Sequence, residues 1–163
     1  MVDPTPFLQS AIGKKVSHVW RGHGSSIFLE LGELTPRTRR DGSPGNPTGE
    51  ISLMIQWSWR IERPQSIYVG SWSSERRWPA AFAKLRGATV TTATLFGRIP
   101  ELSIGLSNGL YVVSFMTAEE QPAWALICRQ SPRGTLHVRR GRLHVEALRG
   151  SGGHAERPKT IPT

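Results

Sequence analysis

The sequence predicts a mainly β, α+β fold in which an antiparallel meander occurs twice and a basic C-terminal tail follows. Short segments of alternating apolar and polar residues recur along the chain, separated by many of its 17 glycines and 12 prolines. Similar elements return in the same order in two halves, 6–73 and 79–129. The composition then changes, because eight of the 21 Lys and Arg but only two of the 12 acidic residues lie in 129–163. These three observations define the expected architecture.

Each half is expected to begin with a short helix, at 6–13 and at 79–87, with proline near its start and glycine just past its end. About four strands follow in each half. The matched strands are 16–19 with 90–93, 27–31 with 102–106, 49–55 with 109–115, and 64–69 with 122–127. Two such meanders, packed face to face or joined edge to edge, predict a pseudo-twofold sandwich or barrel. The groove where the halves meet is the expected ligand site.

The two halves differ in one connection. The second half turns through Ser107-Asn108-Gly109, a tight hairpin sequence. The first half has an insertion there, from Glu33 to Thr48. Its prolines and glycines predict an exposed, mobile loop, which either carries function or is tolerated length. The loop brings three candidate partner or phosphate contacts: Arg37, Arg39 and Arg40.

Residues 130–163 are predicted to be a basic extension. A hairpin is expected at 135–147, and 150–163 are expected to be disordered. The residues from 129 onward hold a net +6 of the chain's formal +9, and the sequence pI is near 11.0. A balance of this kind favours polyanionic partners. Within the hairpin, the candidate contacts are Arg139, Arg140 and Arg142.

Two aromatic groups are candidates for recognition. Trp57 and Trp59 alternate in phase with Ile55 and Ile61, which predicts a buried stripe; the alternative is an aromatic platform for a base or sugar. The joint between the halves, 72–78, mixes two tryptophans with two arginines. There the tryptophans either cap the core or are exposed to a partner. The candidates at this joint are Trp72 and Trp78 as exposed aromatics, and Arg76 and Arg77 as contacts.

The chain shows no pattern typical of a metal, cofactor or catalytic site. Its five histidines lack the helical spacing of common metal ligands, and no CxxC, HExxH or GxSxG occurs. Glu30 and Glu101 lie on predicted strands without an evident partner. His23 lies in a glycine-rich turn that could hold a phosphate, but the turn lacks the P-loop pattern. We expect no cofactor, no metal and no catalytic residue.

The single cysteine, Cys128, excludes an intramolecular disulfide and favours a cytoplasmic protein. It follows an apolar run and is expected to be buried. The N-terminal residues do not form a secretory signal, and no stretch approaches the roughly 20 apolar residues of a membrane span. We therefore expect no membrane association.

A resemblance rests on two strings, 49–62 with Trp57-Ser58-Trp59-Arg60 at its end, and 114–119. Together with the later Trp124, they resemble uncharacterised bacterial hypothetical proteins over residues 10–128. The resemblance implies no activity and no catalytic residue. It implies a bacterial cytosolic accessory protein of the kind found among mobile-element, immunity and defence genes.

Together these observations predict a non-enzymatic protein-interaction module or accessory subunit of a bacterial cytosolic complex. Its candidate surfaces are the groove between the halves, the loop at 36–47 and the joint at 72–78. The alternative is a nucleic-acid-binding accessory protein that contacts phosphates through its arginines. A small-ligand binder or enzyme is the third hypothesis. The oligomeric state is left open.

Overall fold

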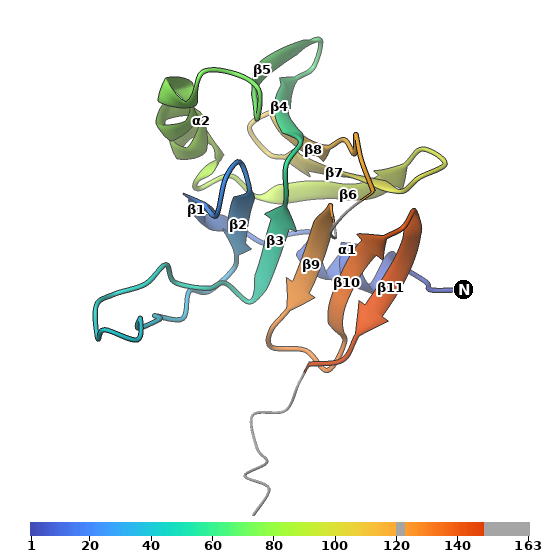
Figure 1. The fold of residues 1–163 in the computed structure, drawn as a ribbon, viewed down its shortest axis with the longest axis horizontal. Coiled ribbons are helices and arrows are strands. Elements are labelled where there is room, and N and C mark those ends of the chain that lie inside the picture. Colours follow the sequence, from blue (N-terminus) through green and yellow to red (C-terminus); the bar gives the residue numbers. More distant parts are fainter. Residues whose placement is uncertain (120–122, 149–163) are drawn as a thin grey trace, which may run out of the picture.

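The computed structural model describes residues 1–119 and 123–148 (Figure 1). It is mainly β, with two antiparallel sheets and few helices, which confirms the predicted fold class. None of the helices in these ranges is both long and apolar enough to cross a membrane.

The larger sheet has six strands, in the order β1-β2-β3-β9-β10-β11. Their bounds are β1 Val16–Arg21, β2 Ile27–Leu31, β3 Ile51–Ile55, β9 Trp124–Cys128, β10 Gly134–Arg139 and β11 Arg142–Glu146. The smaller sheet has five, in the order β5-β4-β8-β7-β6. These are β4 Trp59–Arg63, β5 Ser66–Gly70, β6 Val90–Phe96, β7 Glu101–Leu106 and β8 Tyr111–Ser114. The helices are α1 Thr5–Ala11, the 3-10 turn η1 Glu75–Arg77, and α2 Trp78–Leu85.

The chain crosses between the sheets twice, in a matched way. Strands β1, β2 and β3 form a meander in the first sheet, and the chain then crosses to add β4 and β5 beside β8 of the second sheet. Strands β6, β7 and β8 form the second meander, and the chain crosses back to add β9 and β10 beside β3. Each sheet is therefore completed by strands from the other part of the chain (Figure 1).

The first strands of the two meanders meet at equivalent hydrogen bonds. Gly13 N–H donates to Val90 O at 2.8 Å, and Gly87 N–H donates to Val16 O at 2.8 Å. Both glycines have a positive φ, +85° and +87°, which non-glycine residues rarely adopt. An isolated bridge pairs Lys15 with Thr89 between these contacts. Each helix packs on a strand of the other meander, since α1 packs on β6 and α2 packs on β1.

A single core fills the space between the sheets. Trp59 and Trp124 are fully buried and begin β4 and β9, the first strand after each crossover. Trp59 also packs against two aromatics of α2: its ring centroid lies 5.2 Å from that of Trp78 and 6.1 Å from that of Phe82. Large aromatic side chains bury much apolar area, so they dominate the stability of a small β protein.

The insertion between β2 and β3 is an exposed two-stranded ribbon rather than an irregular loop. Isolated bridges pair Thr35 with Thr48 and Thr38 with Pro44. At its tip, the carboxylate of Asp41 accepts the Ser43 N–H at 2.9 Å, which fixes the turn. The ribbon projects from the six-stranded sheet at the lower left of Figure 1.

The predicted boundary at 129/130 falls inside the six-stranded sheet. The hairpin residues form β10 and β11, and β10 pairs along β9. Leu136 and Val138 of β10 are fully buried in the common core. The structure therefore contradicts the expectation that everything beyond residue 129 is an appendage. The segment predicted to be disordered, 150–163, lies outside the described residues.

Candidate functional site

The two crossover segments lie against each other. Residues 56–58 connect β3 to β4, and the second crossover leaves β8 at Phe115 and reaches β9 at Ala123. Gln56 N–H donates to Ala123 O at 2.8 Å, and Phe115 N–H donates to Ser58 O at 3.2 Å. The contact places side chains from both parts of the chain around one depression.

Trp57 lies at the centre of this contact in a strained conformation. Its φ is +51°, and Ser58 N–H donates to Gln56 O at 2.6 Å, which closes a three-residue turn. Turns of this kind are rare, and a positive φ in a bulky residue costs about 1–3 kcal/mol. The turn breaks the alternation between β3 and β4. Trp57 is therefore 51% exposed, and its predicted burial is wrong, whereas the predicted burial of Trp59 is confirmed.

The neighbouring glycine-rich turn holds Trp57 in place. Ser25 Oγ donates to Trp57 O at 2.8 Å, and Ser25 O accepts the indole N–H of Trp59 at 2.6 Å. Ser26 Oγ donates to His23 O at 2.8 Å. Ser25 thus supports both tryptophans, and because both hydroxyls donate to backbone carbonyls, neither donates to a phosphate at this turn.

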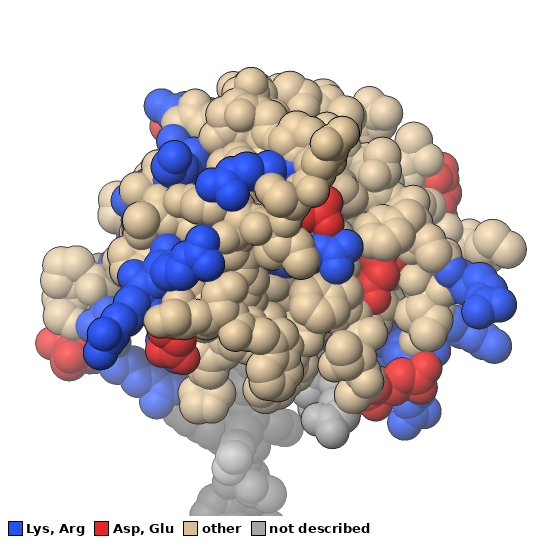
Figure 2. Space-filling view, turned by 90° about the horizontal axis from the view of Figure 1, so that it is seen from above, with Lys and Arg blue, Asp and Glu red and all other residues tan. Residues whose placement is uncertain are grey.

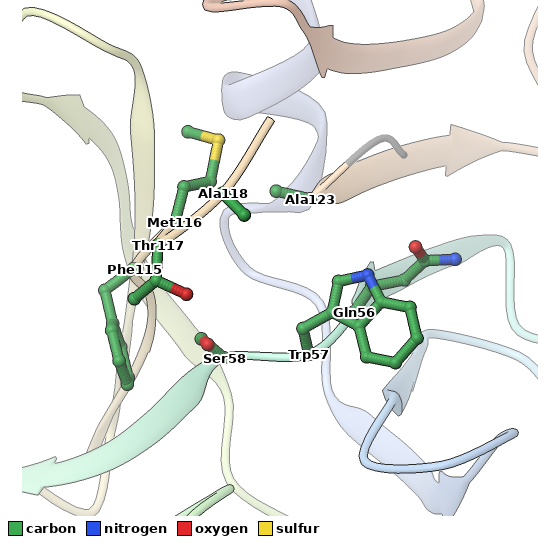
Figure 3. A pocket seen from close by; sticks show the side chains of 8 residues that line it. All are labelled: Gln56, Trp57, Ser58, Phe115, Met116, Thr117, Ala118 and Ala123. Atoms are coloured by element: carbon green, nitrogen blue, oxygen red, sulfur yellow. The ribbon is translucent and has the colours of Figure 1, made fainter. Parts of the chain in front are cut away.

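The depression, here called the crossover groove, is lined by residues 56–58, 115–118 and Ala123 (Figure 3). In Figure 3, Gln56 and Trp57 lie on one side, and Phe115 and Met116 lie on the other. Its volume is about 180 Å³, and more of its lining is apolar than polar. Pockets that enclose drug-sized ligands are larger, roughly 300–1,000 Å³. The groove fits a side chain better than a whole metabolite.

A second hollow continues the groove across Phe115, which lines both. Its other walls include Ile67 and Trp72, which are 61% and 83% exposed. The Arg60 guanidinium lies over the Phe115 ring at 5.5 Å and pairs with Glu62. The groove and hollow together make an apolar, aromatic strip with one cationic side chain.

One polar atom in the groove has no partner. Gln56 Oε1 is buried and accepts no hydrogen bond from the described residues. Buried polar atoms are nearly always satisfied, so an atom without a partner calls for a specific explanation. Gln56 directly precedes the strained Trp57, so the groove combines an unpaired buried oxygen with a residue of positive φ.

The carboxylate of Glu101 contacts the second crossover and is engaged by protein groups. Glu101 Oε1 accepts Met116 N–H at 2.5 Å, and its Oε2 accepts Ser114 Oγ–H at 2.6 Å. Across the described ranges, no group of three or more His, Cys, Asp or Glu could hold a metal ion. The described lining of the groove offers apolar contact and hydrogen bonding.

The predicted arginine contacts do not gather at one place. Arg37, Arg39 and Arg40 are exposed on the ribbon, and Arg139, Arg140 and Arg142 are exposed around the β10–β11 turn. Figure 1 shows the ribbon and this hairpin on opposite sides of the six-stranded sheet. On the face shown in Figure 2, basic side chains lie in separate groups with wide uncharged surface between them.

The joint at 72–78 divides into one exposed and one structural part. Trp72 is exposed as predicted, but Trp78 is only 3% exposed, so its predicted exposure is wrong. The Trp78 indole donates to Gly70 O at 3.1 Å, and Arg77 Nη2 donates to Tyr68 O at 2.7 Å. Both cap carbonyls of the edge strand β5. Arg76 is exposed.

Sequence reasoning missed a buried charged network on the outer face of the larger sheet. Glu30 is fully buried and accepts hydrogen bonds from the Trp20 indole at 3.1 Å, from Gly49 N–H at 2.9 Å and from Ser52 Oγ. Arg129 Nε donates to Ser52 Oγ at 3.1 Å, and burial lowers the pKa of Arg129. Predicting this network would have required the cross-strand register that places His18 and Ser52 opposite Glu30, which the sequence alone does not show.

The sequence matches no family model and no curated protein, and the fold matches no solved structure.

Proposed function

We propose that this chain is a non-enzymatic protein-interaction module, an accessory subunit of a cytoplasmic complex, that receives an apolar side chain of an acidic partner protein in the crossover groove. One observation carries the proposal: a half-exposed tryptophan is held by a strained backbone at the edge of an apolar groove. Strain of this kind persists where it serves a function, because otherwise a less costly residue would replace it.

The composition of the strip supports a protein as the partner. Energetic hot spots of interfaces are rich in Trp, Tyr and Arg and lie in apolar depressions. The strip offers Trp57 and Trp72 at its two ends, with Phe115 and Arg60 between them. Gln56 Oε1 is a buried acceptor without a hydrogen-bond partner among the described residues, beside Trp57.

Charge supports an acidic partner. The chain carries a formal +9, and electrostatic complementarity accelerates the association of oppositely charged proteins. Arg60 adds a cation beside the groove itself. The resemblance to bacterial accessory proteins adds a bacterial host to the proposal and, with it, a setting among immunity or defence genes.

We also infer that the two halves are an internal duplication with exchanged strands. The support is the repeated strand order and the reciprocal hydrogen bonds of Gly13 and Gly87. Each first strand also carries a register irregularity at its beginning, between Val16 and His18 and between Val90 and Thr92. On this inference the crossover groove lies where the halves meet, with one crossover segment from each.

The test uses a photo-crosslinking amino acid at position 72 of the full chain, produced in its native host. The matched control carries the same amino acid at Tyr111, which is 38% exposed at the opposite end of β8 from Phe115. The proposal expects a protein adduct at position 72 that position 111 does not form and that Trp57→Ala suppresses. Equal adducts at both positions, or an adduct that Trp57→Ala leaves unchanged, would contradict it.

Binding to random-sequence DNA and RNA distinguishes the phosphate-binding alternative. Affinity from phosphate contacts falls steeply between about 50 and 200 mM salt. Salt-sensitive binding that is lost when Arg37, Arg39 and Arg40 are replaced together would favour that alternative. Binding that is absent, or that does not change with salt, supports the protein partner.

A further inference from the structure

Among the described strands, β11 is an edge strand with no partner on its outer side. It is the last strand of the six-stranded sheet, and β10 pairs along its inner side only. The two strands join through a two-residue turn in which Arg140 and Gly141 have φ values of +49° and +70°. In such hairpins the pair that flanks the turn is hydrogen-bonded, and the pattern then alternates. The backbone N–H and C=O groups of Leu143 and Val145 therefore point outward.

The opposite end of the fold shows how an edge is closed. On β5, the outer carbonyls of Tyr68 and Gly70 accept hydrogen bonds from Arg77 and Trp78. Within the described part of the chain, no side chain or loop caps Leu143 or Val145 in this way. Exposed apolar side chains accompany the open edge, because Val145 is 43% and Leu148 is 41% exposed. Natural β proteins usually protect such an edge or pair it.

The sequence of β11 is complementary to itself when it runs antiparallel. In the register that pairs all five of its residues, His144 lies on the twofold axis opposite His144 of the second copy. Leu143 and Val145 then lie opposite each other, and their outward backbone groups can form four hydrogen bonds. Arg142 lies opposite Glu146 of the second copy, and this charge pair occurs twice. Glu146 Oε1 lies 3.3 Å from His137 Nε2 within its own chain, and its side chain is 69% exposed, so the carboxylate can take Arg142 of the second copy as an additional partner.

We propose that the chain forms an isologous dimer in which β11 of one copy pairs antiparallel with β11 of a second copy. The two six-stranded sheets then continue across the interface as a single sheet. This inference uses none of the crossover groove residues, so it stands or falls independently of the proposed function.

Charge reversal tests the register. Arg142→Glu and Glu146→Arg each turn both cross-strand pairs into like-charge pairs, and we expect each to raise the dimer dissociation constant about tenfold or more. An equimolar mixture of the two variants restores opposite charges at both positions and should form heterodimers. Arg76→Glu is the matched control, because it makes the same charge change on an exposed residue of η1, next to α2, which packs on β1 at the other edge of the sheet. The readout is analytical ultracentrifugation of the full chain.

A disulfide tests the geometry directly. His144→Cys places two thiols on the twofold axis, where non-hydrogen-bonded partners in an antiparallel pair have Cα atoms about 4.5 Å apart, within reach of a disulfide. Cys128 is only 1% exposed and does not compete. Arg139→Cys is the control, since three strand spacings alone separate its two copies by more than about 14 Å.

On mild oxidation, the proposal expects a covalent dimer from His144→Cys and none from Arg139→Cys. A wild-type chain that is monomeric at about 100 µM, which is well above the Kd of a stable dimer, would overturn the proposal. Charge-reversal variants that dimerise as the wild type does would also overturn it. So would equal cross-linking of the two cysteine variants. Circular dichroism of each variant shows that the fold is kept.

Discussion

Trp57 shows how one residue changes the surface of this molecule. Its neighbours Ile55 and Trp59 are buried, and simple alternation would bury it as well. The positive φ reverses the chain for one residue and turns the indole outward. A glycine would adopt this conformation without the steric cost, so tryptophan at this position does not serve backbone stability.

Trp57→Gly should change the free energy of unfolding by no more than about 1 kcal/mol, because relief of the strain offsets the lost contacts and the added chain entropy. Trp59→Ala should cost about 3–5 kcal/mol, since it empties a fully buried site. Denaturant titration of both variants measures the difference. A Trp57→Gly variant as unstable as Trp59→Ala would show that Trp57 is structural.

Glu50 predicts a pH dependence of stability. The Glu33 N–H and the Lys14 ammonium, at 2.9 Å each, lower the pKa of this carboxyl below its ordinary value of 4.5. Ionised Glu50 therefore stabilises the fold above about pH 4.5, and this contribution is lost as the pH falls through the lowered pKa of the folded state.

Glu50→Gln should accordingly reduce the free energy of unfolding at pH 7, by less than about 1 kcal/mol because the ion pair is partly exposed. The difference from the wild type should shrink at pH 3. Urea titrations at both pH values measure it. An equal loss of unfolding free energy at pH 7 and pH 3 would mean that Glu50→Gln destabilises the fold for reasons other than the loss of charge.

The sequence predicted the individual helices and strands better than it predicted which strands pair with one another. The alternating segments and the Asn108-Gly109 turn correspond to observed strands and their connection, and both helices end just before Gly13 and Gly87. Local patterns predict such elements because backbone preferences act locally. The exchange of strands between sheets depends on hydrogen bonds between residues far apart in the chain, which no local pattern contains.

The candidate site was harder to predict for the same reason. A groove was expected where the proposed halves meet, and Trp72 was a candidate exposed aromatic, but Trp57 was placed in the core. Gln56 and Phe115 acquire their roles only when the crossovers meet. Glu30 likewise had no visible partner until the sheet register brought Trp20 and Ser52 beside it.

The ribbon offers a test of the proposed duplication. Replacing residues 33–48 by Ser-Asn-Gly copies the connection of the other meander into the first. We expect the chain to fold with a loss below about 2 kcal/mol, because shortening a surface loop reduces its closure entropy while contacts such as His18 with Asn46 are lost. Thermal unfolding monitored by circular dichroism measures the change. A variant that cannot fold would contradict the proposal that the two connections are equivalent.

The strand β10 makes a contrasting prediction. A chain that ends at Gln130 loses the buried Leu136 and Val138, whose burial contributes roughly 3–6 kcal/mol together. That is a large part of the stability of a domain of this size, so the truncated chain should be unfolded or aggregated. A chain that ends at Leu148 is the control and should remain folded. Equal stability of the two truncations would show that the last strands are dispensable.

The thiol of Cys128 reports on global unfolding of the molecule. Cys128 is 1% exposed, and burial raises its pKa, so the reactive thiolate is scarce in the folded state. Its reaction with a disulfide reagent should be at least about a hundredfold slower in the folded protein than in denaturant. Because Cys128 lies where β9 pairs with both β3 and β10, its labelling follows the opening of the sheet as a unit.

The central claim is that the crossover groove binds a partner protein through Trp57 and Trp72. The most direct measurement is isothermal titration calorimetry of the crosslinked partner with the wild type, Trp57→Ala, Trp72→Ala and Tyr111→Ala. We expect a loss of about 2 kcal/mol or more, close to thirtyfold in Kd, for each tryptophan variant and less than about 0.5 kcal/mol for Tyr111→Ala. Wild-type affinity in both tryptophan variants would contradict it.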